Sequence, residues 1–123
     1  MAATPHRQHL GRLGERLAAE HFERLGYRVL ARNHHTRLGE LDLVLTDGET
    51  LVFCEVKTRR LGSGEPWESL HGAKRSQVRR MAAAWLAEVT DRPWYAELRF
   101  DAVGVLVDAR DGLVRLDHLA GAF

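Results

Sequence analysis

The sequence contains a single cysteine, Cys54, among its 123 residues, so it forms no intrachain disulfide. A reducing, cytoplasmic compartment is therefore the simplest expectation. No apolar run approaches the roughly 20 residues that a membrane-spanning helix needs, and residues 1–10 lack the apolar centre of a secretory signal. The formal net charge is only +1, which argues against a histone-like basic protein and leaves local nucleic-acid binding open.

Lysine is almost absent: of the 18 lysine and arginine residues, only Lys57 and Lys74 are lysine. The remaining composition is ordinary, with 45% hydrophobic and 28% charged residues, which excludes a disordered chain and a collagen-like repeat. The length fits one domain over residues 1–123, and residues 1–8 are expected to be a flexible N-terminus.

Hydrophobic periodicity predicts a helix, three strands, a second helix and two further strands. The helices are expected over residues 8–25 and 73–89, where apolar residues recur at helical spacing. The strands are expected over residues 27–32, Gly39–Thr46, Thr50–Arg60, Glu97–Val107 and Leu113–Leu119, with residues 33–38 as a polar loop. This order indicates an α/β fold in which two helices flank one mixed sheet.

The second and third strands are the most informative part of the sequence. The Asp-Gly dipeptide at residues 47–48 is a strong hairpin signal, and Asp42 is then expected on the same face as Phe53 and Glu55. A four-residue loop would put Asp42 opposite Glu55, and a two-residue loop would put it opposite Phe53. Either register brings both carboxylates within reach of one ion, since opposite Cβ atoms lie roughly 5 Å apart and diagonal ones roughly 7 Å.

Lys57 shares that face, because side chains two apart in a strand point the same way. A lone Glu55 and Lys57 pair is typical of a surface salt bridge, but the addition of Asp42 favours a site. Uncompensated buried carboxylates cost several kcal/mol, and a divalent cation would offset that cost. Carboxylate oxygens are the ligands that Mg²⁺ takes, and Lys57 would then hold a phosphate oxygen or orient an attacking water.

At these residues the sequence resembles the PD-(D/E)xK nuclease superfamily, which has the restriction-endonuclease-like fold. Asp42 matches its first acid, and Glu55-Val56-Lys57 matches its E-x-K element. The chain as a whole is similar to the YraN family of small, largely uncharacterised bacterial nuclease-like proteins, akin to archaeal Holliday-junction resolvases. The segments that carry this similarity are residues 14–33, 39–48, 51–60, 64–74 and 99–105.

The resemblance implies an αβββαβ core and hydrolysis of phosphodiester bonds in DNA with Mg²⁺ or Mn²⁺, with branched or structured DNA among the substrates. It implies Asp42 and Glu55 as metal ligands, the backbone carbonyl of Val56 as a further ligand, and Lys57 as the catalytic lysine. Glu15 matches the helix acid that joins the site in related nucleases. Its place at the edge of the apolar stripe equally suits an ordinary solvated glutamate.

Four further side chains are predicted to bind DNA: Lys74, Arg59, Arg60 and Gln77. Arg59 and Arg60 extend the E-x-K strand, where they would contact the phosphate backbone. Lys74 stands near the start of the second helix, where the dipole favours a phosphate, although its stem also suits packing on the apolar face. Gln77 matches a position where relatives carry a helix glutamine that contacts the site.

Two classes of function follow from these residues. The first is a metal-dependent nuclease, which the complete set of Asp42, Glu55 and Lys57 favours. The second is a nuclease-like module that binds nucleic acid or a protein partner without cutting it. A homodimer is a further expectation, because cutting both strands of DNA needs two sites, and no membrane association is expected.

Overall fold

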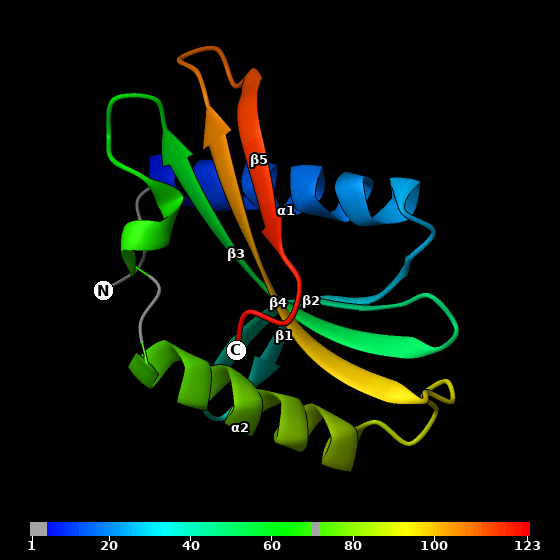
Figure 1. Ribbon diagram of the computed structural model, residues 1–123. Helices are drawn as coiled ribbons and strands as arrows, with labels where there is room; N and C mark the ends of the chain where they lie inside the picture. Colours follow the sequence, from blue (N-terminus) through cyan, green and yellow to red (C-terminus); the bar gives the residue numbers. More distant parts are fainter. Residues whose placement is uncertain (1–4, 70–71) are drawn as a thin grey trace.

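The computed structural model describes residues 5–69 and 72–123, apart from the side chains of residues 69 and 72–75 (Figure 1). Its elements are α1 (Pro5–Arg24), β1 (Arg28–Thr36), β2 (Gly39–Thr46), β3 (Thr50–Arg60), a short 3₁₀ helix η1 (Pro66–Ser69), α2 (Gly72–Glu88), β4 (Glu97–Val107) and β5 (Leu113–Leu119). The predicted order of helices and strands is confirmed, and it fits a restriction-endonuclease-like core.

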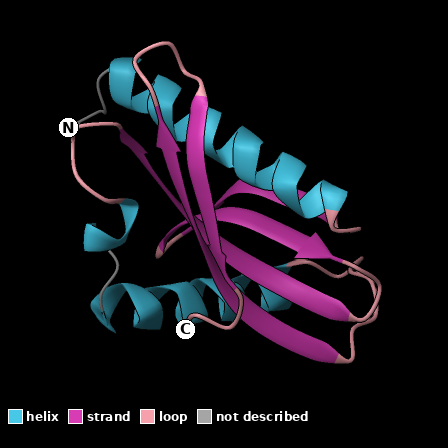
Figure 2. Ribbon diagram, turned by 45° about the horizontal axis from the view of Figure 1, so that its top comes forward, coloured by secondary structure: helices cyan, strands magenta, loops and turns pink. Residues whose placement is uncertain are grey.

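The five strands form one mixed sheet in the order β1-β2-β3-β4-β5. Only β3 and β4 run parallel, and α2 lies in the connection between them, as a parallel crossover requires. The other neighbouring strands are antiparallel. Figure 2 shows the two helices on opposite sides of this sheet, which therefore buries both of its faces.

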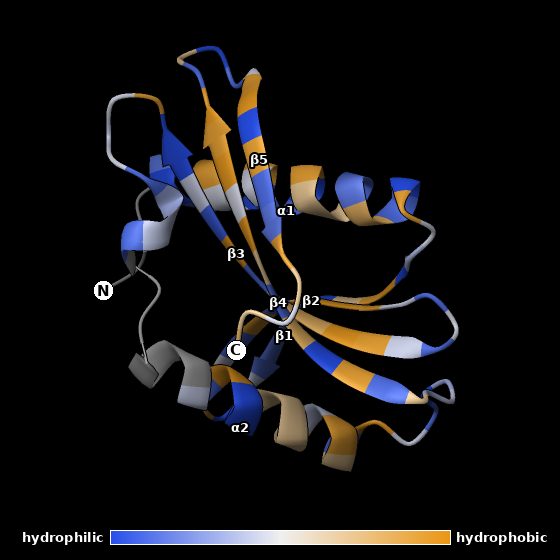
Figure 3. Cartoon of the chain, viewed as in Figure 1, coloured by the Kyte–Doolittle hydropathy of each residue, from blue (hydrophilic) through white to orange (hydrophobic). Residues whose placement is uncertain are grey.

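Each face of the sheet has its own hydrophobic core. On the α1 side, Leu13, Ala18 and Phe22 pack with residues of β2, β3 and β4. On the α2 side, Val78, Met81 and Trp85 pack on the opposite side chains of β2 and β3. The hydrophobic colour prevails in the second half of β4, whereas the neighbouring end of β3 is hydrophilic (Figure 3). The polar end of β3 is therefore the part of the central sheet available for chemistry.

Helix α1 begins at Pro5 and not at Gln8 as predicted, which is consistent with the preference of proline for the first helical position. Residues 5–8 of the predicted flexible terminus are thus helical, and residues 1–4 lie outside the described residues. After Arg24 the chain turns at Gly26, whose φ of 94° is accessible to glycine at low cost. No helix in the described ranges is long and apolar enough to cross a membrane.

The prediction of a loop over residues 33–38 is wrong for its first four residues. Strand β1 continues to Thr36, where it pairs with Gly39, so the β1–β2 turn contains only Arg37 and Leu38. The Thr36 hydroxyl donates to the carbonyl of Gly39 and accepts from the N–H of Leu38. Pairing with β2 and this side-chain hydrogen bonding stabilise a polar segment that propensity alone assigns to a loop.

Gly14 permits a close approach of α1 to β3. A Cβ atom at this position would stand 1.7 Å from Oγ1 of Thr58 and 2.8 Å from its Cβ. Gly14→Ala is therefore expected to destabilise the protein by about 1–3 kcal/mol, the usual cost of overpacking. Urea unfolding measures this change, and adding Thr58→Ala should recover part of the loss. An unchanged unfolding midpoint for Gly14→Ala would contradict the contact.

Candidate metal centre

Strand β2 separates from β3 at Asp42. The backbone pairs run from Thr46 and Leu51 to Leu43 and Cys54, which is the register expected for the four-residue loop. Beyond that pair, Oδ2 of Asp42 accepts a hydrogen bond of 2.8 Å from the N–H of Val56. Because strand N–H groups lie in the plane of the sheet, the Asp42 carboxylate occupies the fork between the two diverging strands.

The alternation of faces along β2 breaks at this fork. Leu41 packs in the core on the α2 side, whereas Leu43 packs in the core on the α1 side. Phe53 also lies on the α2 side, with its ring 5.6 Å from that of Trp85. The expectation that Asp42 shares a regular strand face with Phe53 is therefore wrong, because the Asp42 carboxylate lies in the fork between the strands.

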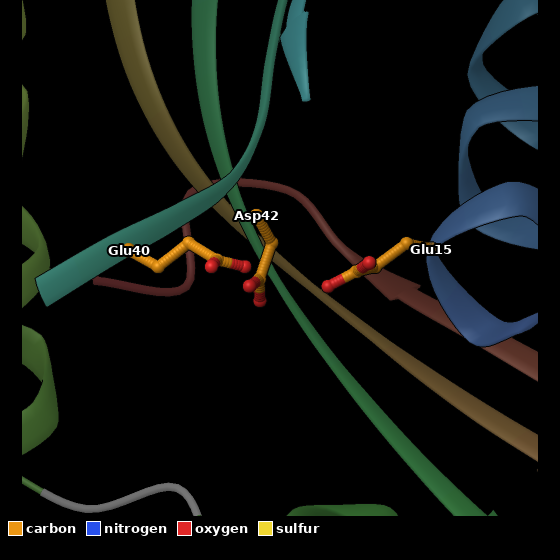
Figure 4. Close-up of side chains that lie close together, drawn as sticks. All are labelled: Glu15, Glu40 and Asp42. Atoms are coloured by element: carbon orange, nitrogen blue, oxygen red, sulfur yellow. The ribbon is translucent and has the colours of Figure 1, made fainter. Parts of the chain in front are cut away.

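Three carboxylates converge at the fork. One oxygen each from Glu15 of α1 and from Glu40 and Asp42 of β2 lie within 4.8 Å of one another. Figure 4 shows the three side chains pointing toward a common point from the helix and the strand. Among the described residues this is the one group of three or more potential metal ligands, and its hard oxygen donors suit Mg²⁺ or Mn²⁺.

Burial and neighbouring charges shape the ionisation of this cluster. The side chain of Glu15 is only 16% exposed, and burial raises its pKa. A hydrogen bond from Asn33 and the charge of Arg12 oppose this increase, whereas the charge of Glu40 adds to it. Asn33 also donates to Oε1 of Glu40 at 2.9 Å. The amide therefore orients two of the three carboxylates, and a cation between them would relieve their mutual repulsion.

Glu55 and Lys57 lie on the neighbouring part of β3. Glu55 is buried, at 3% exposure, and its Oε1 lies 3.6 Å from Nζ of Lys57. Glu55 is not among the three carboxylates that converge around Asp42, so its role as a metal ligand stays a prediction. Lys57 borders a hollow of about 340 Å³ together with Glu15 and Arg59, so the predicted catalytic lysine and one carboxylate of the cluster line the same hollow.

Two other residues predicted for the site, Val56 and Arg60, make contacts within the protein. Val56 donates its N–H to Asp42 and packs its side chain in the α1-side core, and ligation through its carbonyl stays a prediction. Arg60 donates to the carbonyl of Asp108 at 2.6 Å and to Oδ1 of Asp111 at 3.0 Å. It therefore ties the end of β3 to the β4–β5 turn, and its contact with DNA is untested.

Gln77 of α2 donates to the carbonyl of Leu38 at 2.7 Å. It thereby anchors the β1–β2 turn, directly ahead of the segment that carries Glu40 and Asp42, and its contact with the site stays a prediction. The side chain of Lys74 lies outside the described residues, and its contact with a phosphate remains an expectation.

The sequence interpretation missed Glu40 and Asn33. Glu40 stands two residues before Asp42 in β2, a spacing that on a regular strand would bring the two carboxylates to one face. Asn33 was assigned to a loop, but it lies in β1 at a position between the pairs that flank Asp42, with a φ of 48°. Asparagine tolerates such a φ better than most residues, so the residue type itself is the only sign in the sequence of an irregular backbone at this position.

Comparison with known proteins places the chain in a family. The model of the uncharacterised protein family UPF0102 matches residues 14–105. A UPF0102 protein of Acidothermus cellulolyticus is 46% identical, with 95% of each chain covered. A UPF0102 protein of Frankia casuarinae is 50% identical over 93% of this chain and 95% of its own length. Because the family model covers most of the chain and these relatives are 46% and 50% identical over nearly all of it, the chain belongs to the uncharacterised protein family UPF0102.

Proposed function

We propose that this protein is a metal-dependent nuclease that hydrolyses phosphodiester bonds in DNA, including branched or structured DNA. The observation that carries the proposal is the convergence of Glu15, Glu40 and Asp42 within 4.8 Å of one another at the fork of β2 and β3. Three carboxylates from two elements are costly to bring together without a cation. Their fit to a hard divalent ion supports Mg²⁺ or Mn²⁺ as the cofactor.

Each side chain has a role that its position supports. Glu15, Glu40 and Asp42 would hold the metal ion, and Glu55 would hold the ammonium group of Lys57 in place. Lys57 borders the same hollow as Glu15, so its ammonium would hold a phosphate oxygen or orient the attacking water. The bound metal would lower the pKa of a water molecule and polarise the phosphate. The resemblance to the PD-(D/E)xK superfamily supports the roles of Glu15, Asp42 and Lys57, and it differs in giving Glu55 and the Val56 carbonyl, not Glu40, to the metal.

Lys57→Met tests the proposal directly. It is expected to slow the cleavage of labelled junction, flap and single-stranded DNA by roughly 10²–10⁴-fold with Mg²⁺ present, because the variant keeps the carboxylate cluster and loses the ammonium group. Arg110→Met, an exposed change in the β4–β5 turn, should leave the rate unchanged. Absence of cleavage by the wild-type protein with Mg²⁺ and Mn²⁺, or equal rates for Lys57→Met and wild type, would overturn the proposal.

A second candidate is a non-catalytic module that binds nucleic acid or a protein partner. Calorimetric titration separates the two functions, because a nuclease of this kind must bind Mg²⁺ or Mn²⁺ at the carboxylate cluster. DNA binding without metal binding would favour the module. The homodimer is likewise a proposal, and a monomeric mass in light scattering at micromolar concentration would contradict it.

A further inference from the structure

Two hollows flank Glu15 on the surface of α1. The first, of about 340 Å³, reaches Lys57 and Arg59 on β3. The second, of about 290 Å³, reaches Arg12 and Glu40. Both are lined by the same three residues of α1: Arg7, Gly11 and Glu15. The two hollows therefore meet along about two turns of the helix, and Glu15 of the carboxylate cluster lines both.

Gly11 has no structural reason to be glycine. It lies inside α1, where glycine is less favourable than alanine. Its φ is not positive, and a Cβ atom at this position would meet nothing within 4 Å. Gly14, one turn further along the same helix, differs because Thr58 leaves no room for a Cβ atom. The missing side chain at Gly11 therefore leaves the surface of the helix open to a ligand that approaches from outside the chain.

The charges around the two hollows indicate the chemical class of a ligand that would fit them. Cationic side chains line both of them: Arg7, Arg12, Lys57 and Arg59. The anionic groups between them, Glu15 and Glu40, belong to the carboxylate cluster. A chain of phosphates suits this arrangement, because its outer phosphates would meet arginine while the central one meets the metal site.

We propose that the two hollows form one groove across α1 and that the DNA strand to be cut crosses the helix at Gly11. Arg7, Arg12 and Arg59 hold its phosphates on the two sides of the cluster. Gly11 is the floor of this groove, since any side chain there would occupy the path of the sugar-phosphate backbone. The inference rests on the proposed nuclease function and adds the path of its substrate.

Gly11→Gln and Gly11→Ala test the groove in an Asp42→Asn background, which prevents cleavage of the probe. Fluorescence anisotropy with a labelled single strand and a labelled four-way junction measures the Kd of each double variant relative to Asp42→Asn alone. Gly11→Gln is expected to raise Kd at least tenfold (about 1.4 kcal/mol) and Gly11→Ala about threefold. Gly11→Ala should also raise the melting temperature by about 2–5 °C, because alanine favours the helix.

Two features distinguish a DNA contact at Gly11 from a general loss of structure: a control variant, and the expectation that Gly11→Ala weakens DNA binding while it stabilises the fold. Ala83→Gln adds a similar side chain to an exposed position of α2, on the other face of the sheet, and should leave Kd unchanged. A purely structural role for Gly11 would weaken stability and binding together. A Kd for Gly11→Gln within twofold of its background, while Asp42→Asn has lost cleavage, would overturn the groove alone. Wild-type cleavage by Asp42→Asn would instead overturn the proposed function.

Discussion

Asp42→Asn is expected to abolish Mg²⁺ binding and to slow DNA cleavage by roughly 10³-fold or more, since the ion contributes several kcal/mol of charge stabilisation. The carboxylate lies between Glu15 and Glu40, so its loss removes the central donor of the cluster. The asparagine oxygen can still accept the hydrogen bond that Val56 donates to Asp42. The fork between β2 and β3 should therefore persist in Asp42→Asn, so a loss of Mg²⁺ binding and of cleavage would come from the metal site itself.

Isothermal titration with Mg²⁺ and Mn²⁺, together with cleavage rates, measures this result. Glu40→Gln and Glu55→Gln are the informative companions, because sequence spacing pairs Asp42 with Glu55 whereas the structure brings it together with Glu15 and Glu40. Glu40→Gln is expected to weaken metal binding about as much as Asp42→Asn. Full metal affinity in Glu40→Gln, with a loss in Glu55→Gln, would favour the pair derived from the sequence.

Asp101→Asn is expected to destabilise the protein by about 3 kcal/mol at pH 7, because it removes one partner of a buried ion pair. Asp101 is fully buried and accepts two hydrogen bonds from Arg99, at 2.7 and 2.8 Å. It also accepts from the N–H of Gly121 at 3.0 Å and is joined to Nε2 of His118 at 2.7 Å. One carboxylate thus ties β4 to β5 and to the C-terminal segment.

The same carboxylate makes stability depend on pH. Burial opposes ionisation of Asp101, but hydrogen bonds from His118, Arg99 and Gly121 outweigh it and hold its pKa at about 2, against an ordinary value of 3.8. A depressed pKa in the folded state means that the stabilisation is complete above about pH 4 and is lost as the pH falls toward 2. The difference in stability between wild type and Asp101→Asn should therefore shrink over that range.

Urea unfolding of both proteins at pH 7, 5, 4, 3 and 2 measures this dependence. Asp91→Asn is the matched control, because Asp91 is exposed and such surface changes usually stay within about 0.5 kcal/mol. A difference between wild type and Asp101→Asn that is small at pH 7, or that grows on acidification, would contradict the role of the buried carboxylate.

Local sequence patterns were sufficient to predict much of the secondary structure of this protein. The hairpin signal at Asp47-Gly48 and the alternation on either side of it predicted β2 and β3 with the observed bounds. Arg99 and Asp101 stand two residues apart in β4, a spacing that puts both side chains on one face, and they form an ion pair at 2.7 Å. These features depend on residues that are close in the chain, where the 2.0 and 3.6 residue periods operate directly.

The sequence by itself determined the order of the elements, the α/β class and the candidates Asp42, Glu55, Lys57 and Glu15, because periodicity and turn chemistry act over short stretches of chain. Only the tertiary structure decided that Glu40 joins Glu15 and Asp42. That outcome depends on how β2 leaves β3, a break in alternation that accompanies the positive φ of Asn33 on the neighbouring strand. Such a departure depends on contacts between separate elements, and no periodic pattern records it.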